Sequence, residues 1–417
     1  MKVIHVSTSD IEGGASRATF RLNNAINKNT SNDIQSSLCV LNKISDDKTI
    51  FSNLSRKSQY FFKLKSFISI KLQQLQLTNN SVLHSSSFFS SSILNSLEKS
   101  DADLIHLHWV QGEMLSIEDI GRIKKPVIWT LHDAWAFCGS EHYPKDYNDK
   151  RYIEGYLKDN RDLTDSGIDL DMYAWHRKKK NWNREMNIVC PSNWLKECVQ
   201  NSKLMSNWPV KVIPNTLPTN IYKPWPKSYA RQLFDLPQDM TLILFGALNA
   251  TTDKRKGWDL LKIALSRLSK SISPCSAVVF GESGPLEDLS LGMPIFFMGR
   301  LYDDQSLALL YSAADVMIVP SLMESFGQTA SEAQSCGLPV VAFDTSGLKD
   351  IVEHQKTGFL GKRFDPLDLV AGVEWVLEDD DRYNLIRQSS LNRAKRLWSP
   401  EVVADKYVKL YQEVLEK

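Results

Sequence analysis

The sequence predicts an α/β protein made of two parallel α/β domains, and three observations support this. Short apolar runs rich in Val, Ile, Leu and Phe recur along the chain, and most of them end in Gly or Pro-Ser. Such runs are typical of strands that are buried on both faces. Segments with helical spacing lie between them, and the alternation restarts near 214–227. The chain of 417 residues is longer than a single domain with one hydrophobic core usually is, so its length also predicts two domains.

The first predicted domain covers residues 1–216. It opens with a strand at 3–6, a turn containing Gly13 and Gly14, and a helix from Ser16 to Ile26. Four further strands are expected, at 103–108, 126–131, 187–190 and 210–213. The polar stretch 146–183 lacks clear strand signals and is interpreted as a loop-helix insertion. An amphipathic helix within 399–417 is expected to complete this domain.

The second predicted domain covers residues 217–398. Its strands are expected at 241–245, 276–280, 295–298, 316–319 and 339–343. Ligands of parallel sheets bind beyond the carboxyl ends of the strands. Two such domains facing each other would therefore hold a ligand in the cleft between them.

Composition excludes several classes of protein. Lys and Arg number 50 against 49 Asp and Glu, so no global charge indicates a nucleic-acid partner. The six cysteines are scattered without a C-x-x-C pair, which argues against a zinc site or a disulfide framework. No signal-peptide pattern and no apolar run of membrane-spanning length is visible, so a cytoplasmic protein is expected.

The stretch Glu324-Ser-Phe-Gly-Gln-Thr-Ala-Ser-Glu332 is the strongest candidate site. A helix is expected to begin near Ser325 to Gly327 and to run to about Cys336. The amides at its start, together with the helix dipole, favour an anion such as a diphosphate. Glu324 before the helix and Glu332 within it could accept hydrogen bonds from sugar hydroxyls. On the residues alone, a helix start with ordinary capping acids is an equally good interpretation.

With its flanks, this segment resembles the E-x(7)-E signature of glycosyltransferase family 4, a retaining family with the GT-B fold. P-S-x-x-E-S-F-G precedes the signature and E-A-x-x-x-G-L-P-V-V-A follows it. The resemblance implies two Rossmann-like domains facing across a cleft, and a nucleotide-sugar donor. It implies that Glu332 binds the ribose and that Glu324 contacts the donor sugar. It also implies that the sugar and diphosphate are held at the helix start, by Ser325, Phe326, Gly327, Gln328 and Thr329.

A second stretch, Lys254-Arg-Lys-Gly257, places three cations before a predicted helix. Cations oppose the dipole of a helix start, so phosphate binding explains them better than a solvated charge run. Lys256-Gly257 matches the K-G of the family. The arginine usual in the family is absent at Ala247, and Arg255 is the candidate to replace it.

Two glycine loops and a strand-end histidine add further candidates. The resemblance places Gly13 and Gly14 beside the donor phosphates and the acceptor, and a plain tight turn is the alternative. Arg17, four residues after Gly13, could face the same cleft. It places the nucleotide base near Gly299, Arg300 and Leu301. His132 follows a central strand, where function concentrates, and the resemblance puts it near the anomeric centre. The acceptor candidates are Arg17, His108, Trp109, Asp133 and His142, although the histidines among these are equally well interpreted as structural.

Residues 56–72 combine cations with aromatic and aliphatic side chains. A basic aromatic helix of this kind can lie on an anionic membrane surface. An ordinary, partly buried surface helix is the alternative. The resemblance favours contact with the cytoplasmic face of the inner membrane, because the family often acts on lipid-linked acceptors.

The predicted function is therefore hexose transfer with retention, from a UDP- or GDP-sugar to a glycan or lipid-linked saccharide. Surface polysaccharide synthesis (O-antigen, capsule or exopolysaccharide) is the expected pathway. Cations and amides would stabilise charge on the leaving diphosphate, with His132, Glu324, Arg255 and Lys256 as the catalytic candidates. No D-x-D pair follows a strand of the second domain, so neither a metal nor another cofactor is expected. A nucleotide-sugar epimerase on the same architecture and a non-catalytic sugar-binding protein are the alternatives.

Overall fold

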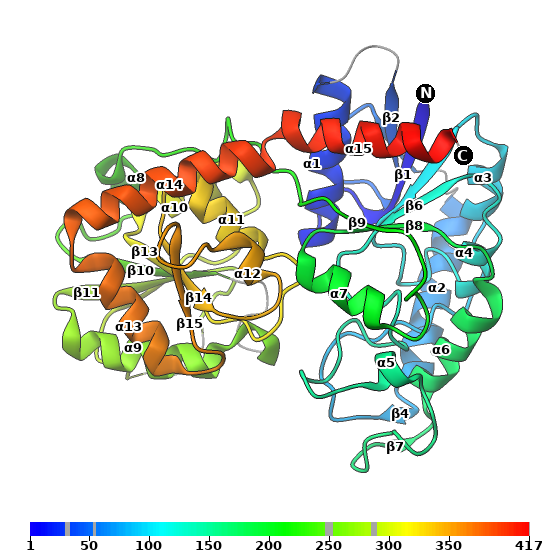
Figure 1. Cartoon of the computed structure of the whole chain (residues 1–417), viewed down its shortest axis with the longest axis horizontal. Coiled ribbons are helices and arrows are strands. Elements are labelled where there is room, and N and C mark those ends of the chain that lie inside the picture. The colour runs from blue at the N-terminus through cyan, green and yellow to red at the C-terminus, as the bar shows by residue number, and fades with distance from the viewer. Residues whose placement is uncertain (30–33, 53–55, 247–252, 285–289, 417) are drawn as a thin grey trace. The chain divides into compact units, whose positions relative to one another are not determined.

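The computed structural model describes residues 1–29, 34–52, 56–246, 253–284 and 290–416. The described chain divides into two compact units, Met1–Thr216 with Pro400–Lys417 and Leu217–Ser399. Each unit is a parallel sheet with helices on its faces (Figure 1).

Within the described residues, unit 1 contains a seven-stranded parallel sheet in the order β3-β2-β1-β5-β6-β8-β9. Its strands are β1 (Lys2–Ser9), β2 (Gln35–Asn42), β3 (Ile50–Phe51), β5 (Leu104–Leu107), β6 (Val127–Thr130), β8 (Asn187–Cys190) and β9 (Val210–Val212). Its helices are α1 (Gly14–Asn29), α2 (Arg56–Gln73), α3 (Ile93–Lys99), α4 (Ile117–Gly121), α5 (Arg151–Glu154), α6 (Leu170–Asn181), α7 (Asn193–Asn201) and α15 (Pro400–Leu415). A short antiparallel pair joins β4 (Gln76–Leu77) to β7 (Ser166–Gly167).

Unit 2 contains, in its described part, a six-stranded parallel sheet in the order β12-β11-β10-β13-β14-β15. Its strands are β10 (Thr241–Gly246), β11 (Cys275–Phe280), β12 (Ile295–Phe297), β13 (Val316–Val319), β14 (Val340–Phe343) and β15 (Gly358–Gly361). Its helices are α8 (Lys227–Leu233), the 3-10 turn η1 (Lys254–Lys256), α9 (Trp258–Ser271), α10 (Asp304–Ala313), α11 (Gln328–Ser335), α12 (Leu348–Ile351), α13 (Pro366–Leu377) and α14 (Asp380–Trp398).

Both sheets are buried on both faces, as their apolar strands require. Successive side chains of a strand point to opposite faces. On β10, Leu242 and Leu244 join one core cluster while Ile243 and Phe245 join another. On β5, Leu104 packs with residues of α1 and α15, while Ile105 packs in the large core on the other face.

The structure corrects several sequence expectations. β2 and β3 in unit 1 and β15 in unit 2 were not predicted. The insertion 146–183 contains a short strand, β7, beside α5 and α6. Helix α11 begins at Gln328, just after the expected start, because Gly327 has a left-handed backbone with φ of 98°. It ends at Ser335, close to the expected end near Cys336.

Candidate functional site

The candidate site of unit 2 lies at the carboxyl edge of three neighbouring strands, β10, β13 and β14. The segments that follow these strands contribute Lys256, Glu324 and Ser346. The Glu324 amide donates to Ser346 Oγ at 2.9 Å, and the Gly347 amide donates to the Glu324 carbonyl at 2.9 Å. The backbone around Glu324 is thus fixed by the loop after β14, at the edge where parallel sheets bind ligands.

Lys256 and Glu324 form an ion pair, with 2.6 Å between Nζ and Oε1. Both side chains are largely buried. Burial alone would raise the pKa of Glu324, but the charges of Lys256 and Arg255 and the hydrogen bond from Lys256 outweigh it, so the pKa lies below its ordinary value. Glu324 is therefore a fixed carboxylate at neutral pH.

Gly257 is what allows Lys256 to reach Glu324. It ends η1 with φ of 72°, and a Cβ at this position would lie 2.0 Å from the Pro320 carbonyl oxygen. Only glycine combines that backbone angle with so close an approach. The K-G pair is therefore a geometric unit, because the glycine brings the lysine against the segment that holds Glu324.

The start of α11 presents backbone amides without a side-chain cap. Gln328 and Thr329 lie in its first turn, and Gly327 occupies the cap position. Helix starts of this kind favour an anion through their amides and the dipole. Phe326 does not face such a ligand with its ring, since the ring is buried and packs edge-on against Trp398. Ser325 and Phe326 link the start of α11 to Glu324.

Glu332 lies in α11 and is only 4% exposed. The hydroxyl of Tyr311, on α10, donates to Glu332 Oε2 at 2.9 Å. Tyr311 was not predicted from the sequence, because nothing in the motif indicates which residue of another helix orients the second glutamate.

Arg255 is oriented by Asp253, another residue that sequence reasoning missed. Its Nη2 contacts Asp253 Oδ2 at 2.7 Å, and Asp253 also caps η1 by accepting from the Arg255 amide. The Arg255 carbonyl accepts from Leu322 at 2.7 Å, which ties η1 to the segment before Glu324. Ala247 lies outside the described residues, so its loop is not compared with Arg255.

The loops after β11 and β12 are joined at Gly299, whose φ is 62°. Its carbonyl accepts from the Gly281 amide at 2.7 Å. Arg300 is exposed, with its guanidinium 5.1 Å from the Tyr302 ring, and Leu301 packs partly buried against a core cluster. These residues lie at strand ends of the same sheet as Glu324.

In unit 1, the predicted glycine turn leads from β1 into α1. Gly13 has φ of 87°, and α1 begins at Gly14. The Arg17 amide donates to the Gly13 carbonyl at 3.1 Å, and the Arg17 side chain is half-buried on the first turn.

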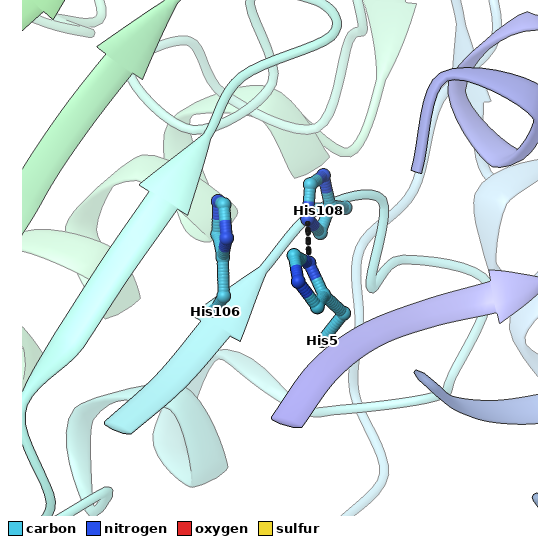
Figure 2. Close-up of side chains that lie close together, drawn as sticks. All are labelled: His5, His106 and His108. Atoms are coloured by element: carbon cyan, nitrogen blue, oxygen red, sulfur yellow. Dashed lines mark hydrogen bonds between the residues drawn. The ribbon is translucent and has the colours of Figure 1, made fainter. Parts of the chain in front are cut away.

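Four histidines of unit 1 form a cluster: His5 on β1, His106 on β5, His108 just after β5 and His132 just after β6. Figure 2 shows the first three of them. His5 Nδ1 lies 2.9 Å from His108 Nε2, and His108 Nδ1 lies 3.1 Å from His132 Nε2. His106 contacts Tyr411 and Thr130, each at 2.8 Å. Burial lowers the pKa of His5 to about 3 and that of His132 to about 4. His5 was missed from the sequence, although β1 pairs it directly with His106.

The remaining acceptor candidates are mostly buried and satisfied within unit 1. Asp133 Oδ2 contacts His142 Nδ1 at 2.6 Å and accepts from Trp109 Nε1 at 3.0 Å. Burial would raise the pKa of Asp133, but His142 and these hydrogen bonds hold it below its ordinary value. Trp109 is only partly buried and stacks on His142. Asp133 and His142 therefore orient Trp109.

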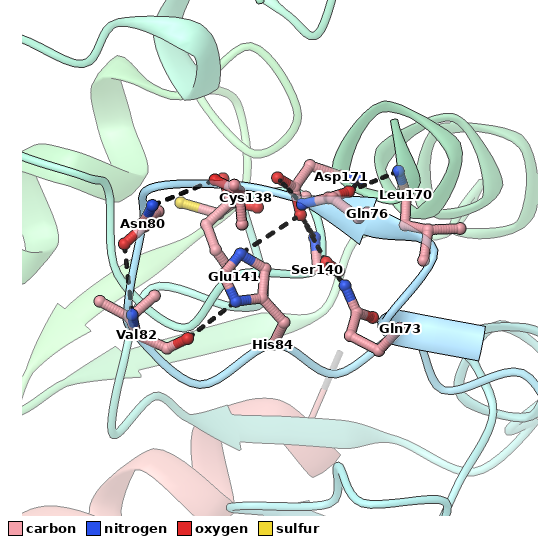
Figure 3. A network of polar contacts seen from close by, with 12 residues as sticks. Gln73, Gln76, Asn80, Val82, His84, Cys138, Ser140, Glu141, Leu170 and Asp171 are labelled. Atoms are coloured by element: carbon pink, nitrogen blue, oxygen red, sulfur yellow. Dashed lines mark hydrogen bonds and ion pairs between the residues drawn. The ribbon is translucent and has the colours of Figure 1, made fainter. Parts of the chain in front are cut away.

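A polar network ties the insertion to the rest of unit 1 (Figure 3). Asp171, on α6, accepts from Gln76 at 2.7 Å and from the hydroxyl of Ser140. Lys178, on the same helix, is fully buried and donates to the carbonyls of Trp135, Cys138 and Gly139. The sequence had been interpreted only as part of a polar loop-helix insertion at 146–183. Instead, Lys178 fixes the segment that follows His132 and Asp133.

Comparison with known proteins now adds to this geometry. Residues 240–393, within unit 2, match the family model described as "Glycosyl transferases group 1". The chain carries a glycosyl transferases group 1 domain. A D-inositol 3-phosphate glycosyltransferase of Thermobispora bispora is 33% identical over 224 residues, which are 50% of this chain and 51% of that protein. The sulfoquinovosyl transferase SQD2 of Arabidopsis thaliana is 34% identical over 148 residues, 34% of this chain and 28% of that protein. The chain thus spans about half or less of these relatives.

Solved structures resemble the whole chain. Sucrose-phosphate synthase from Thermosynechococcus elongatus has a TM-score of 0.69 at 17% identity, covering 100% of this chain and 99% of that one. HepE from Anabaena, in complex with UDP-glucose, has a TM-score of 0.66 at 17% identity, covering 99% and 100%. These likenesses confirm the predicted GT-B glycosyltransferase fold. None of the described helices is both long and apolar enough to cross a membrane.

Proposed function

We propose that this chain is a retaining glycosyltransferase that moves a hexose from a nucleotide-diphosphate sugar to a glycan or lipid-linked saccharide. One observation carries the proposal. Lys256, Glu324 and the uncapped start of α11 lie together at the carboxyl edge of a sheet whose sequence matches a glycosyltransferase domain. A cation, a carboxylate and a set of amides are the groups that a sugar diphosphate needs.

In this proposal, the diphosphate binds at the amides of Gln328 and Thr329 and to the ammonium of Lys256. Charge develops on the leaving diphosphate as the bond between the anomeric carbon and the phosphate oxygen breaks. Fixed hydrogen-bond donors stabilise that charge. Arg255 supplies a second cation, held in place by Asp253. Glu324 accepts hydrogen bonds from the donor sugar, Glu332 from the ribose, and the loop 299–301 lies beside the base. The proposal needs neither a metal nor another cofactor.

Unit 1 offers a place for the acceptor. A cavity of about 520 Å³ is lined by Trp109, Glu113 and residues of α2 and of the segment 82–85. Several of its polar side chains are Ser or Gln, among them Ser66, Ser69 and Gln73. An aromatic face beside such groups suits a saccharide, which stacks its C–H face and uses its hydroxyls as donors and acceptors. His132 and Arg17 are the other acceptor-side candidates.

Two similar solved structures support a proposal for the pathway and for the donor base. WaaG, described as a glycosyltransferase involved in lipopolysaccharide biosynthesis, has a TM-score of 0.63 at 16% identity over 97% of this chain and 99% of that one. HepE was solved with UDP-glucose. These support a UDP-sugar over a GDP-sugar and a role in surface polysaccharide synthesis, such as O-antigen, for this chain.

We further propose that α2 rests on the cytoplasmic face of the inner membrane. Its apolar side chains Phe61, Phe67 and Ile70 are more than half exposed, and Lys63 and Lys71 are exposed beside them. Such a surface matches an anionic lipid interface. Co-flotation with vesicles containing anionic phospholipid is expected, and it should be lost when Phe61 and Phe67 become serine. Equal flotation of that double variant would exclude this contact.

The transfer reaction is tested by release of nucleoside diphosphate from UDP- and GDP-sugars, with and without saccharide acceptors. Wild-type release should depend on acceptor, and Lys256→Ala, Glu324→Ala and Glu332→Ala should each lower it by roughly 100-fold or more. Lys262→Ala is the matched control, because Lys262 lies on α9 and pairs with Asp259 of the same helix. Near-normal rates in all three variants would exclude the assignment. Product without acceptor would indicate an epimerase, and binding without turnover a sugar-binding protein.

A further inference from the structure

His5, His108 and His132 form a continuous chain of ring nitrogens in unit 1. The contacts are 2.9 Å between His5 Nδ1 and His108 Nε2 and 3.1 Å between His108 Nδ1 and His132 Nε2. His108 thus uses both nitrogens on other imidazoles. Its carbonyl also accepts from the indole of Trp129 at 3.0 Å, so the residue in the middle of the chain is held by its backbone as well.

A metal ion does not explain this cluster. The ligand atoms of His5, His106 and His108 lie within 4.8 Å of one another. Both nitrogens of His106, however, contact the hydroxyls of Tyr411 and Thr130. The ring centroids of His106 and His108 are 4.2 Å apart and the ring planes are tilted by 33°, so these two rings pack against each other (Figure 2). Metal ligands instead direct the lone pairs of their ring nitrogens at one point.

The alternative is a hydrogen-bonded chain of neutral imidazoles. His5 and His106 are fully buried and His108 nearly so, and burial lowers the pKa of each far below neutral pH. A neutral imidazole has one N–H and one lone pair. Each contact in the chain therefore needs one donor and one acceptor, and fixing one tautomer fixes all three.

The buried end of the chain decides its direction. His5 Nε2 is buried and has no hydrogen-bond partner. If it carried the proton, a buried N–H would lack an acceptor. If it carries the lone pair, an acceptor is left unused, which proteins tolerate more readily than an orphaned donor. In that direction His5 Nδ1–H donates to His108 Nε2, and His108 Nδ1–H donates to His132 Nε2.

We infer that His5 and His108 are positioning residues that hold His132 in its Nδ1–H tautomer, with Nε2 accepting from His108. His132 is the partly exposed end of the chain, at the carboxyl end of β6. Held in this way it is a hydrogen-bond donor through Nδ1 and has no nitrogen left to take up a proton. Any oxygen that contacts Nδ1, whether it belongs to the protein or to a ligand, must then accept a hydrogen bond.

The chemical consequence for transfer rests on the proposed function, but the tautomer does not. For glycosyl transfer, the inference limits His132 to donating through Nδ1 and excludes it as the general base that deprotonates the acceptor. Two substitutions at one position separate the links of the chain. The amide nitrogen of asparagine can occupy the place of His108 Nδ1, whereas that of glutamine can occupy the place of Nε2.

The test is ¹⁵N NMR of the histidine side chains in the full-length chain, without donor or acceptor. The signal of His132 is assigned as the one missing in His132→Gln. The inference predicts the Nδ1–H tautomer in the wild type and in His108→Asn, and a shift toward the Nε2–H tautomer in His108→Gln. The Nε2–H tautomer in the wild type would overturn it, and so would an unchanged Nδ1–H tautomer in His108→Gln.

Folding and activity are followed in the same proteins. The ¹H–¹⁵N amide spectrum shows whether each variant is folded, and the wild-type tautomer is decisive even if one is not. If transfer is found, His108→Gln should lower kcat by roughly tenfold, with the KM for the donor nearly unchanged, and His108→Asn should restore most of it. Equal loss in both variants would contradict the positioning role. Absence of transfer in the wild type would refute the proposed function while leaving the tautomer measurement valid.

Discussion

At the scale of single residues, glycine positions control the site of unit 2. Gly257 lets the chain turn so that its preceding lysine meets Glu324. The ion pair itself costs desolvation energy, as buried pairs do. Its value lies in holding a cation and a carboxylate at a fixed separation where a sugar phosphate needs both.

Gly257→Ala tests this control. The new Cβ would lie 2.0 Å from the Pro320 carbonyl oxygen, at a φ of 72°. Gly337→Ala is the matched control, because its φ is 73° but its nearest neighbour would lie at an ordinary 3.6 Å. Urea unfolding should show a loss of about 1–2 kcal/mol for the control, from strain alone, and a clearly larger loss for Gly257→Ala. Equal losses would mean that the approach to Pro320 is unimportant.

Lys178→Met tests the buried lysine. The ammonium donates to the carbonyls of Trp135, Cys138 and Gly139, and methionine fills similar volume without a donor. A buried carbonyl left without a donor costs about 1–3 kcal/mol, and the three carbonyls are not all expected to lose the full amount. The free energy of unfolding should therefore fall by at least about 2 kcal/mol. The neighbouring Lys179→Met is the control, since Lys179 is exposed. A fall of less than 1 kcal/mol, on the order of one ordinary hydrogen bond, would refute this role.

Lys178 also shows where sequence reasoning ends. Runs of lysine are usually solvated, and only the packing of α6 against Trp135 reveals that one of them is buried. Glu324 and the helix start were candidates from one motif, and Lys256 from a second, because each motif consists of residues that are close in sequence. Tyr311, Asp253 and His5 could not, since their roles depend on contacts between different elements.

At the scale of elements, apolar strands ending in Gly or Pro-Ser were predictable because burial on both faces leaves a strong pattern. β2, with the sequence Gln35-Ser-Ser-Leu-Cys-Val-Leu-Asn42, begins polar and was missed. β15 is short and both starts and ends in glycine, which weakens any strand signal. Its place at the sheet edge, beside β14, is set by tertiary pairing.

The histidines on β1, β5 and the end of β6 predict acid sensitivity. The folded pKa values of His5, about 3, and of His132, about 4, lie below the unfolded value of about 6.5. The unfolded chain therefore binds more protons below pH 6.5. This contribution to stability is fully present above that pH and is lost as pH falls toward the folded values, by at most roughly 1.4 kcal/mol per pH unit for each histidine.

Urea unfolding between pH 7 and pH 5 measures this slope. His5→Asn keeps an amide near the position of Nδ1 and should reduce the slope, because one buried imidazole no longer titrates on unfolding. His176→Gln is the control, since His176 is exposed. A pH-independent stability in the wild type over this range would show that the cluster is not neutral in the folded state.

At the scale of the whole molecule, the chain returns to unit 1 at its end. Helix α15 buries Val403, Tyr407, Leu410 and Tyr411 against α1 and the sheet, and its two tyrosines contact Thr130 and His106. The C-terminal helix is therefore a structural part of the unit that begins at residue 1. The residues that match the glycosyl transferases group 1 family model, 240–393, lie within unit 2 and do not include α15.

Removing residues 400–417 should therefore unfold unit 1 and leave unit 2 intact. Differential scanning calorimetry should show loss of one transition, because a buried apolar face and two tyrosine hydroxyl contacts disappear together. Tyr411→Phe, which removes one hydroxyl, should cost only about 1 kcal/mol. A truncated chain with both transitions unchanged would show that α15 is dispensable.

The most direct test of the central claim is a crystal structure of the chain with a nucleoside diphosphate bound. The proposal predicts the diphosphate at the start of α11, in contact with the amides of Gln328 and Thr329 and with Lys256 Nζ, and the ribose hydroxyls on Glu332. A nucleotide bound elsewhere, with Lys256 and the start of α11 making no contact to phosphate, would contradict the account.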